Sequence, residues 1–522
     1  MPKRPKLVAN GVHDRQYLTA VRVGPSVVAM SSDSSPRAQG NRWAVLALLG
    51  VAQLMVVLDA TIVNIALPSA QRDLGFSTDN RQWIVTAYAL AFGSLLLIGG
   101  KLGDLFGRKW TFIGGLIGFA VVSFIGGLAP SFGVLVAARA LQGVFGALLA
   151  PSALGLLTIT FADSPDRPKA FGIFAAVATA GASVGLLLGG ALTDALSWRW
   201  CLYVNLVIAV PAAIVALRLL VTERHPDPPA IDWLGVVLAC TGLFAVVYGF
   251  SSAERDSWEA TTTIVSLAVG VVLLVAFIVS QRRAAHPLLP LHIIWHRARG
   301  GAYLSIVIAA ASMFAVFLFL TFFMQQNLGY SPLKTGVAFL PMTAMIFIVA
   351  PTIQTKVLPR LGVRPIVMTG MALGLLSMLL FFTRLDASST YLGTVLPGLV
   401  MIGIGMPCVF APCFATATLG VDRQEAGVAS AMVNTSQQIG GAVGTAVLST
   451  IFAHASAGYI ADHGRTATVA SDAAIHGYAA AFTFAAVLFS IGFVIAAVIL
   501  PRTIQPPQAQ PAAEPEPAGA PA

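Results

Sequence analysis

The chain has 522 residues, of which 57% are hydrophobic and 10% charged, and its mean hydropathy is +0.82. Soluble globular domains carry about 25% charged residues, so a soluble protein is excluded and an integral membrane protein is indicated. The net charge of +9 does not indicate nucleic acid as a partner, because the charged residues fall mostly between the apolar segments.

Apolar runs of about 20 residues, long enough to cross a bilayer as a helix, recur along the sequence. An even number of such helices places both termini on one side, and the excess of Lys and Arg in the connections makes that side cytoplasmic. The sequence therefore predicts an all-α, multi-pass protein of the cell (inner or plasma) membrane. We predict fourteen spans, at 43–67, 81–100, 110–129, 131–161, 169–192, 200–221, 231–250, 261–280, 301–325, 335–358, 364–383, 390–418, 426–452 and 478–500.

The N-terminal tail, 1–42, lacks the apolar core and cleavage site of a signal peptide, so we expect it to be cytoplasmic. A translation start at Met30 is a hypothesis, which peptides from 1–29 in mass spectrometry would contradict. The C-terminal tail, 501–522, is rich in Pro and Ala, and we expect it to be disordered. The cysteines lie in apolar runs and are interpreted as packing residues rather than disulfides or metal ligands: Cys201, Cys240, Cys408 and Cys413.

Asp59 lies inside the first predicted helix, in a stretch from Trp43 to Pro68 that is otherwise uncharged. Because a charge at bilayer depth costs about 3 kcal/mol or more, such a residue is interpreted as functional. Only Arg139, in the fourth helix, lies comparably deep. At 1.5 Å per residue, Asp59 and Arg139 lie about 13 Å and about 12 Å below the outer ends of their helices. The two side chains can therefore meet, directly or through water.

Two short motifs recur at nearly the same offset. Leu74-Gly75-Phe76-Ser77 returns as Leu328-Gly329-Tyr330-Ser331, an offset of 254 residues, and Lys101, Gly107 and Lys109 return as Lys356, Gly362 and Arg364, an offset of 255 residues. The recurrence indicates two six-helix halves in the same membrane orientation, although coincidence between glycine-rich loops is the alternative. The predicted halves are 43–221 and 300–500, with two inserted helices in the segment 222–299.

Several motifs carry a resemblance to a known family. The run from Leu58 to Pro68 (LDATIVNIALP) resembles the first-helix signature of the fourteen-helix drug:proton antiporters of the major facilitator superfamily. The loop from Gly100 to Lys109 (GKLGDLFGRK) is similar to the superfamily signature between helices 2 and 3. Further matches are R-x-x-Q-G-x-x-G from Arg139 to Gly146, Trp198-Arg199-Trp200 with Asn205, and Gly427 to Gly444 with Asn434, Gln437 and Gln438.

This resemblance covers about residues 43–500 and implies the major facilitator fold and proton-driven efflux by alternating access. In the fifth helix Gly172, Gly181, Gly185, Gly189 and Gly190 have the spacing associated with antiporters. The sequence has Leu186 where the family usually has proline. After Asn205 it has Leu206-Val207, where proline and glycine usually follow nearby. A stripe for close helix packing is the alternative interpretation of these glycines.

The resemblance assigns proton coupling to Asp59 and Arg139; a permanent structural ion pair is the alternative. In the loop, Gly103 and Gly107 permit close backbone approach, and Asp104 with Arg108 forms a predicted ionic latch that the resemblance assigns to the outward-open state. We refer to Gly100, Lys101, Gly103, Asp104, Gly107 and Arg108 as the latch residues. An ordinary basic loop that serves topology is the alternative.

Intramembrane amides among Phe and Met side chains suit a cavity for small amphipathic molecules, although such amides also bridge helices. The candidates are Gln53, Asn64, Gln142, Gln325, Gln326, Asn434, Gln437 and Gln438. The expected partners are therefore an amphipathic substrate, protons and membrane lipid. We expect no cofactor and no metal, and we interpret His286, His292 and His296 as part of an interfacial segment at 287–299 rather than a metal site.

Three alternatives compete with drug efflux. An ATP-driven pump is disfavoured, because the sequence has no Gly-x4-Gly-Lys-Ser/Thr motif. A membrane-embedded enzyme is disfavoured, because every histidine lies in a tail, a loop or the end of a span. A proton-coupled transporter dedicated to one metabolite or self-made antibiotic is the main alternative. Helices 7 and 8 carry no buried charge and are expected to be peripheral or to serve in oligomer contacts.

Overall fold

The computed structural model describes residues 36–77, 80–222, 231–386, 388–422, 424–464 and 467–502. The described residues from Asn41 onward form one compact unit, and of residues 1–40 only 36–40, the beginning of the first helix, are described. The expectations for Met30, for most of the N-terminal tail and for 503–522 lie outside the described residues.

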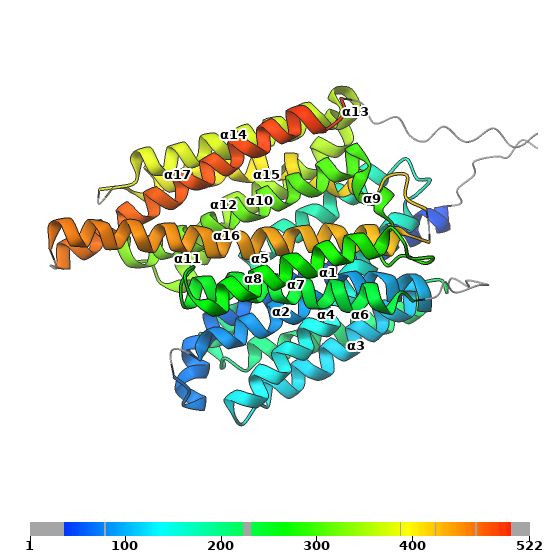
Figure 1. The fold of residues 1–522 in the computed structure, drawn as a ribbon, viewed down its shortest axis with the longest axis horizontal. Helices are drawn as coiled ribbons and strands as arrows, with labels where there is room; N and C mark the ends of the chain where they lie inside the picture. The colour runs from blue at the N-terminus through cyan, green and yellow to red at the C-terminus, as the bar shows by residue number, and fades with distance from the viewer. Residues whose placement is uncertain are drawn as a thin grey trace, which may run out of the picture. The chain divides into compact units, whose positions relative to one another are not determined.

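Every regular element in the described part of the chain is a helix (Figure 1). In lipid a spanning segment must pair its own backbone groups, so apolar sequences of this length fold as helices. The elements are α1 (Pro36–Leu74), α2 (Arg81–Phe106), α3 (Arg108–Gly127), α4 (Phe132–Thr160), α5 (Arg167–Ala195), α6 (Trp200–Leu219), α7 (Trp233–Arg255), α8 (Thr261–Gln281), α9 (Leu291–Trp295), α10 (Arg297–Phe322), η1 (Phe323–Asn327), α11 (Pro332–Ala338), α12 (Leu340–Thr352), η2 (Ile353–Val357), α13 (Leu358–Leu361), α14 (Val363–Arg384), η3 (Tyr391–Val395), α15 (Leu396–Ala417), α16 (Ala426–His463) and α17 (Ala467–Ile499).

Fourteen helical segments among these residues are long and apolar enough to cross a membrane, which confirms the predicted number. The prediction also placed each of them correctly in the sequence. The structure extends several of them, most of all α1, which spans Pro36–Leu74 where the sequence predicted 43–67, and α16, which runs to His463 where the sequence predicted an end near residue 452. Pro68 does not end α1, which continues to Leu74.

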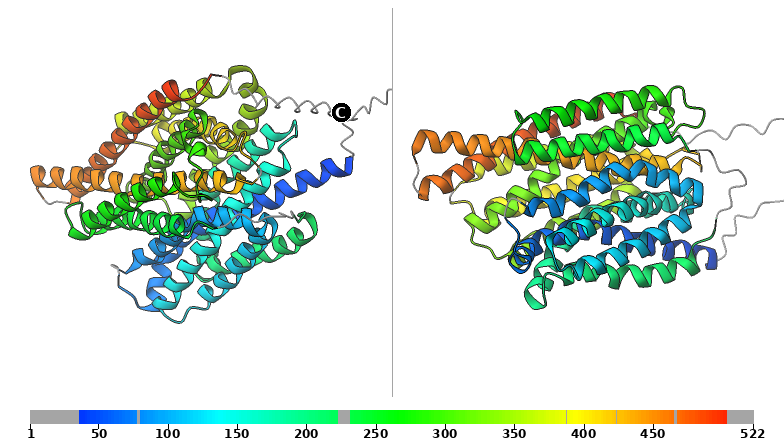
Figure 2. Two further views of the ribbon diagram at one scale, coloured as in Figure 1. Left: turned by 45° about the vertical axis from the view of Figure 1, so that its right-hand side comes forward. Right: turned by 60° about the horizontal axis from the view of Figure 1, so that its bottom comes forward.

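The helices α1–α6 belong to the N-terminal half and α10–α17 to the C-terminal half. Within the first half α4 packs against α2 and α3, and α3 packs against α6; within the second, α14 packs against α15 and α17, and α10 against α16. Between the halves, α5 lies against α12 and α15, while α16 lies against α2 and α4. The long helices run side by side in a common direction (Figure 2). The predicted residue boundaries of the halves stay predictions.

The inserted helices α7 and α8 form a pair at the periphery. They pack closely on each other, and α7 also contacts α2 from one half and α16 from the other. The most apolar window of α8 is only 17% buried, the lowest value among the fourteen spans. This placement agrees with the predicted peripheral role.

The two copies of the predicted repeat share an unusual backbone conformation. Gly75 and Gly329 have φ values of 68° and 66°, and Gly107 and Gly362 have φ values of 88° and 77°. Side chains with a Cβ rarely adopt these angles, so glycine is required at each of the four turns. The offsets of 254 and 255 residues thus relate structurally equivalent turns, as the repeat predicted.

Candidate functional site

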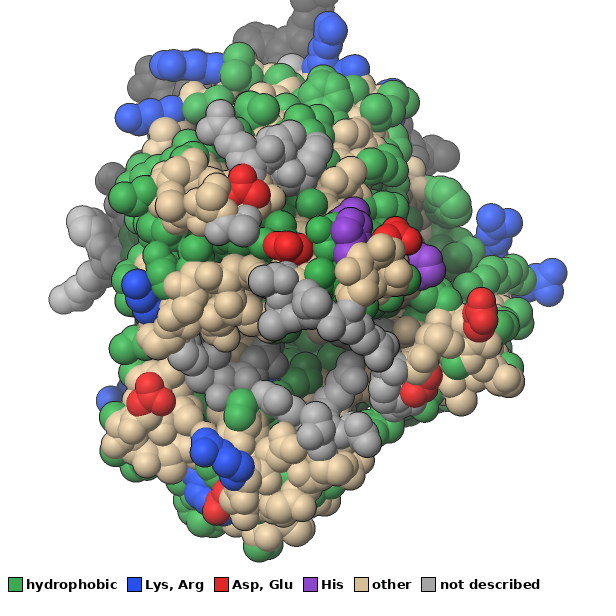
Figure 3. All heavy atoms as spheres, turned by 90° about the vertical axis from the view of Figure 1, so that its left-hand side faces the viewer, with side chains coloured by type: hydrophobic (Ala, Val, Ile, Leu, Met, Phe, Trp, Pro, Cys, Tyr) green, Lys and Arg blue, Asp and Glu red, His purple; other side chains and the backbone are tan. Residues whose placement is uncertain are grey.

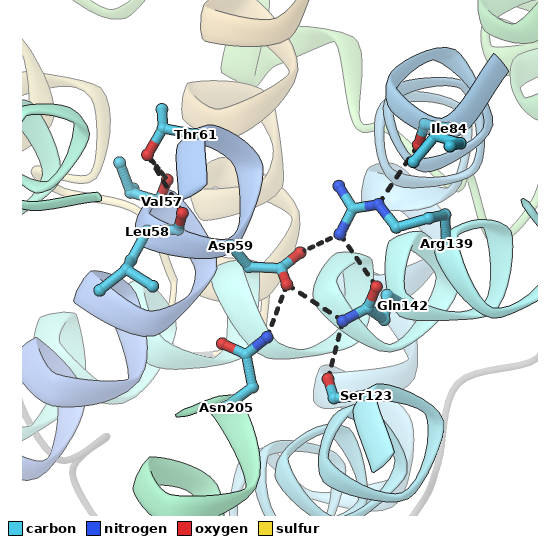
Figure 4. Close-up of polar contacts among 9 residues, drawn as sticks. All are labelled: Val57, Leu58, Asp59, Thr61, Ile84, Ser123, Arg139, Gln142 and Asn205. Carbon is cyan, nitrogen blue, oxygen red and sulfur yellow. Dashed lines mark hydrogen bonds and ion pairs between the residues drawn. The ribbon is translucent and has the colours of Figure 1, made fainter. Parts of the chain in front are cut away.

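Asp59 is completely buried in α1 and accepts three hydrogen bonds (Figure 4). Its Oδ2 lies 2.6 Å from Nη1 of Arg139 on α4, in an ion pair whose side chains are 0% and 1% exposed. Its Oδ1 accepts from Nδ2 of Asn205 on α6 at 2.6 Å and from Nε2 of Gln142 on α4 at 3.0 Å. The structure thus brings together the two deep charges that the sequence singled out.

Arg139 and Gln142 extend this cluster to α2 and α3. Arg139 donates from Nη1 to Oε1 of Gln142 at 2.9 Å and from Nε to the carbonyl of Ile84 at 3.2 Å. Gln142 lies 2.7 Å from Oγ of Ser123, and the Arg139 guanidinium lies 4.5 Å from the centre of the Tyr88 ring. We call Asp59, Ser123, Arg139, Gln142 and Asn205 the polar layer (Figure 4).

The polar layer suits a carboxylate that changes its protonation state. Both amides and the guanidinium donate to Asp59, an arrangement that an ionised carboxylate accepts in full. Protonation turns one carboxyl oxygen into a donor and removes the charge that holds Arg139. A donor that faces the protonated oxygen must then move, and because the layer joins four helices, a single proton can alter contacts among them. The assignment of proton coupling to Asp59 and Arg139 stays a prediction.

Sequence reasoning missed part of this layer. Gln142 was expected to face a substrate cavity, but it is fully buried beside Asp59. Its spacing of three residues from Arg139 was the available signal, because residues i and i+3 share a helix face. Asn205 was recognised only as part of a family motif, and Ser123 and Tyr88 were not singled out. No spacing rule relates α3 or α6 to Asp59, since these contacts arise from packing.

The latch residues lie where α2 meets α3 and the beginning of α16. Asp104 and Arg108 form an ion pair at 2.5 Å, with side chains that are 1% exposed. Oδ1 of Asp104 also accepts a hydrogen bond from the backbone amide of Gly427 at 3.1 Å. Gly100 faces Gly427 so closely that a Cβ on either residue would collide with the other backbone. The loop therefore connects the two halves through a contact that crosses from α2 to α16.

The remaining latch residues have separate environments. A Cβ on Gly103 would lie 3.3 Å from Oγ of Ser152 on α4, and Gly107 takes the left-handed backbone conformation that ends α2. Lys101 is half-buried. A second bond between the halves lies nearby, where Nη2 of Arg167 donates to the Thr418 carbonyl at 3.4 Å. These contacts hold α5 and α15 together at the end where α2 meets α16.

Three glycines of α5 face α1, whereas Gly172 faces Ala350 and Pro351 of α12. A Cβ on Gly181 would lie 3.0 Å from Val57, one on Gly185 would collide with the Thr61 hydroxyl, and one on Gly189 would lie 2.9 Å from Ile62. This is the geometry of the packing stripe, the alternative that the sequence left open. Gly190 points elsewhere, towards Leu333 of α11 in the other half. The α5 helix is continuous from Arg167 to Ala195 and contains proline only in its first turn.

The remaining amides are distributed over both halves. Gln53 on α1 is buried, Gln325 and Gln437 are half-buried, and Nδ2 of Asn434 donates to the Ser430 carbonyl at 3.0 Å. Gln326 accepts from the Tyr478 hydroxyl at 3.3 Å. The side chain of Asn64 lies outside the described residues. The face at which α16 ends and α17 begins is hollowed near its middle, with hydrophobic side chains inside the hollow (Figure 3).

The histidines before α10 are not brought together as ligands. Nε2 of His292 lies 3.0 Å from Oε2 of Glu425, and burial together with the neighbouring Arg299 lowers the pKa of His296. Among the described residues, no group of three or more His, Cys, Asp or Glu has the arrangement of a metal site. The described cysteines are all free thiols.

A bundle of fourteen apolar helices in two related halves, with buried charges in its interior, defines a multi-pass membrane transporter. A family model described as Major Facilitator Superfamily matches residues 49–445, and the chain belongs to this superfamily. The human organic anion transporter MFSD10 has the same fold, with a TM-score of 0.59 at 16% identity over 87% of this chain and 99% of that chain.

Several relatives are similar in sequence over most of their length. The puromycin resistance protein pur8 of Streptomyces alboniger is 45% identical over 91% of this chain and 94% of its own length. The cephamycin export protein CmcT of Amycolatopsis lactamdurans is 39% identical over 79% and 85%. The multidrug efflux pump LfrA of Mycolicibacterium smegmatis is 32% identical over 80% and 82%.

Proposed function

We propose that this protein is a proton-coupled antiporter that exports antibiotics or other amphipathic drugs. The observation that carries the proposal is the buried ion pair of Asp59 and Arg139, in which Oδ2 lies 2.6 Å from Nη1, inside the fold of a transporter superfamily. The export and resistance proteins named above support the direction and the substrate class. The Lys and Arg excess supports cytoplasmic termini.

The proposed cycle uses Asp59 as the proton carrier and the latch as a conformational brace. With Asp59 ionised and paired with Arg139, the transporter opens to the cytoplasm and accepts substrate. It then reorients, and the contact between Asp104 and Gly427 closes the cytoplasmic side. An external proton neutralises Asp59 and releases Arg139, which favours substrate release and return.

The proton gradient is sufficient as the energy source. One charge that crosses about 100 mV provides about 2.3 kcal/mol. Because about 1.4 kcal/mol corresponds to a tenfold ratio, each proton supports nearly a fifty-fold gradient of a neutral substrate. The proposal therefore includes no nucleotide, metal or organic cofactor, and assigns the protein no enzymatic reaction.

Reconstituted proteoliposomes test the proposal. An imposed pH gradient should drive accumulation of a fluorescent amphipathic drug by the wild type, with stoichiometric proton movement reported by an internal pH dye. Asp59→Asn should lower proton-driven transport by about a hundredfold or more while retaining substrate–substrate exchange. Asp386→Asn, which alters an exposed carboxylate of the other half, is the matched control and should transport normally. Full proton-driven transport by Asp59→Asn would refute the proposal.

A transporter dedicated to one compound is the second candidate. It is favoured by the names of two of the relatives above, each of which refers to a single compound, puromycin and cephamycin. The same proteoliposomes distinguish the candidates when a panel of unrelated cationic and neutral drugs is compared. Transport of one panel member supports the dedicated exporter, and transport of several supports multidrug efflux.

A further inference from the structure

The polar layer divides the hydrophobic interior of the N-terminal half into two parts. On one side lies a cluster of buried residues from the ends of the helices, including Val63, Leu135 and Leu202. On the other side lies a second cluster that contains Val56, Ala147 and Ala209. Three helices of the layer, α1, α4 and α6, contribute to both: Asp59 lies between Val56 and Val63, Arg139 and Gln142 between Leu135 and Ala147, and Asn205 between Leu202 and Ala209. We call the first group the outer cluster.

The outer cluster encloses a small pocket directly beyond the polar layer. Val63 follows Asp59 by four residues, Leu135 precedes Arg139 by four, and Cys201 precedes Asn205 by four, so each lines the pocket one helical turn outside its polar partner. Ile84, whose carbonyl binds Arg139, also lines it. The complete lining is apolar: Val63, Ala66, Leu67, Ala70, Ile84, Leu135, Trp198, Cys201 and Leu202.

Trp198 lines this pocket just before the beginning of α6, three residues ahead of Cys201. The tryptophan is 6% exposed, and its Nε1 donates to Oδ2 of Asp73 at 3.0 Å. The same oxygen pairs with Nη2 of Arg199 at 2.9 Å, while Nη1 of Arg199 donates to the carbonyls of Gly127 and Ala129. Asp73 is half exposed, so the carboxylate that holds Trp198 lies at the surface.

The polar layer is enclosed within its own half. The hydrogen-bond partners of Asp59 lie on α4 and α6, and the layer extends from there to α3 and α2; none of these contacts involves a described residue of α10–α17. The helices α3 and α6 carry exposed apolar side chains, among them Val121 and Val210, on their other faces. Asp59 therefore points into the six-helix half.

We propose that the outer cluster is a hydrophobic gate through which external protons reach Asp59 inside the N-terminal half. The route passes beside Trp198 and does not use the hollow of Figure 3. The inference rests on the proposed proton coupling at Asp59. A small apolar cavity stays dry, and dry apolar constrictions block ions until they fill with water. When the outer ends of the helices separate, water enters the pocket and a proton adds to a carboxyl oxygen of Asp59.

The neighbouring groups fit this route. The charged and titratable side chains around Asp59 are Arg139 from α4, Tyr88 from α2 and, across the pocket, the Cys201 thiol of α6. At the surface the route begins at Asp73 and Arg199. The lining between these two levels offers no side-chain carboxylate or amine, so water is the only carrier that the pocket can admit.

A substitution that fills the pocket tests the gate. Ala66→Leu places additional carbon atoms in the lining, and Ala52→Leu, at a buried alanine of the same helix on the inner side of the polar layer, is the matched control. Ala66→Leu should slow substrate-coupled proton movement by about tenfold or more, with substrate–substrate exchange retained within about twofold of the wild type. Ala52→Leu should leave the ratio of substrate-coupled proton movement to substrate–substrate exchange as in the wild type.

The outcomes separate this gate from the proposed function. If the wild type moves no protons with substrate, the proposal of proton coupling at Asp59 is refuted, and the proposal of the gate is refuted with it. If the wild type and Ala66→Leu move protons equally fast while Asp59→Asn does not, the coupling stands and the gate is refuted.

Thiol labelling provides a measurement that does not depend on transport. With Cys240, Cys408 and Cys413 replaced by Ala, Cys201 is the single thiol, and it lies in the pocket wall. In a Trp198→Ala background, a small water-soluble reagent should label Cys201 from the external side about tenfold faster than from the cytoplasmic side. Labelling that is faster from the cytoplasmic side, or that Trp198→Ala does not accelerate, would overturn the proposal.

Discussion

The two halves share a repeat but differ in what they bury. Four of the five buried charged residues in the described chain, Asp59, Asp104, Arg108 and Arg139, lie in the N-terminal half. The C-terminal half buries Arg299 and an aromatic cluster instead, in which Phe319 packs on Phe452, Tyr478 and Phe482 with ring centroids 5.3–6.4 Å apart. The same fold thus places charge in one half and apolar packing in the other.

This difference indicates that the two halves have different roles. A buried ion pair adds little to stability, because desolvation offsets its attraction, whereas aromatic packing stabilises a structure directly. The N-terminal half therefore carries groups that suit switching, and the C-terminal half resembles a passive support. The following substitutions compare the two halves.

The largest effect is expected at the buried arginine. Arg139→Ala leaves Asp59 charged and unpaired, so it should destabilise the folded protein by about 3–5 kcal/mol. Thermal unfolding in detergent measures this loss. The double variant Asp59→Asn, Arg139→Gln removes both charges and should recover most of it. Arg299→Ala in the other half, where Nε and Nη1 have no hydrogen-bond partner, should cost about 1 kcal/mol or less. Equal losses at both arginines would contradict the comparison.

A smaller effect is expected where the halves meet. Gly427→Ala places a Cβ against the Gly100 backbone and so separates α2 from α16. A cost of about 2 kcal/mol corresponds to about a thirty-fold shift towards the state open at that end, which spin-label distances between the two helices measure. Gly458→Ala on the same helix, where a Cβ has open space, is the control. An unchanged distance distribution in Gly427→Ala would show that the contact between Gly100 and Gly427 does not stabilise the state that is closed at this end.

The third prediction concerns the polar layer itself. Asn205→Ala removes one of the three donors to Asp59, so the carboxylate loses part of the arrangement that holds it beside Arg139. Proton-driven transport at a fixed pH gradient should fall by about tenfold, the equivalent of about 1.4 kcal/mol. Asn434→Ala in the C-terminal half removes an amide that donates to the Ser430 carbonyl of its own helix, and it should transport at the wild-type rate. Equal losses in the two variants would contradict the assigned role.

The smallest effect is expected in the aromatic cluster. Tyr478→Phe keeps the ring packing and removes only the bond to Gln326, so it should change stability by about 1 kcal/mol or less. Tyr88→Phe is its counterpart in the N-terminal half and keeps the ring beneath Arg139. Transport assays at several pH values should find neither profile displaced. A displaced profile in Tyr478→Phe alone would assign the C-terminal half a part in proton coupling.

The sequence predicted the features that follow from the position of a charged residue or from a pattern that repeats along the chain. Apolar runs located the fourteen spans, and counting residues along two helices placed Asp59 and Arg139 at similar depth. The offset between Gly75 and Gly329 identified turns that share a left-handed backbone. These inferences depend on one segment at a time, or on a direct comparison of two.

The other features depend on packing between distant segments. The bond from the Gly427 amide to Asp104 spans 323 residues and involves a backbone donor that every residue except proline offers. Asn205 reaches Asp59 because α6 packs against α3, which no property of the sequence around Asn205 shows. The role of the α5 glycines also became clear only when Val57 and Thr61 were seen opposite them.

The peripheral pair α7 and α8 has a consequence for molecules dissolved in the bilayer. Because α7 contacts both α2 and α16, the pair covers one of the two lines along which the halves meet. Along the other line, α5 lies against α12 and α15, and neither of the inserted helices packs there. A lipophilic molecule that approaches through the membrane therefore meets an asymmetric protein, in which the inserted pair covers one of the two lines and not the other.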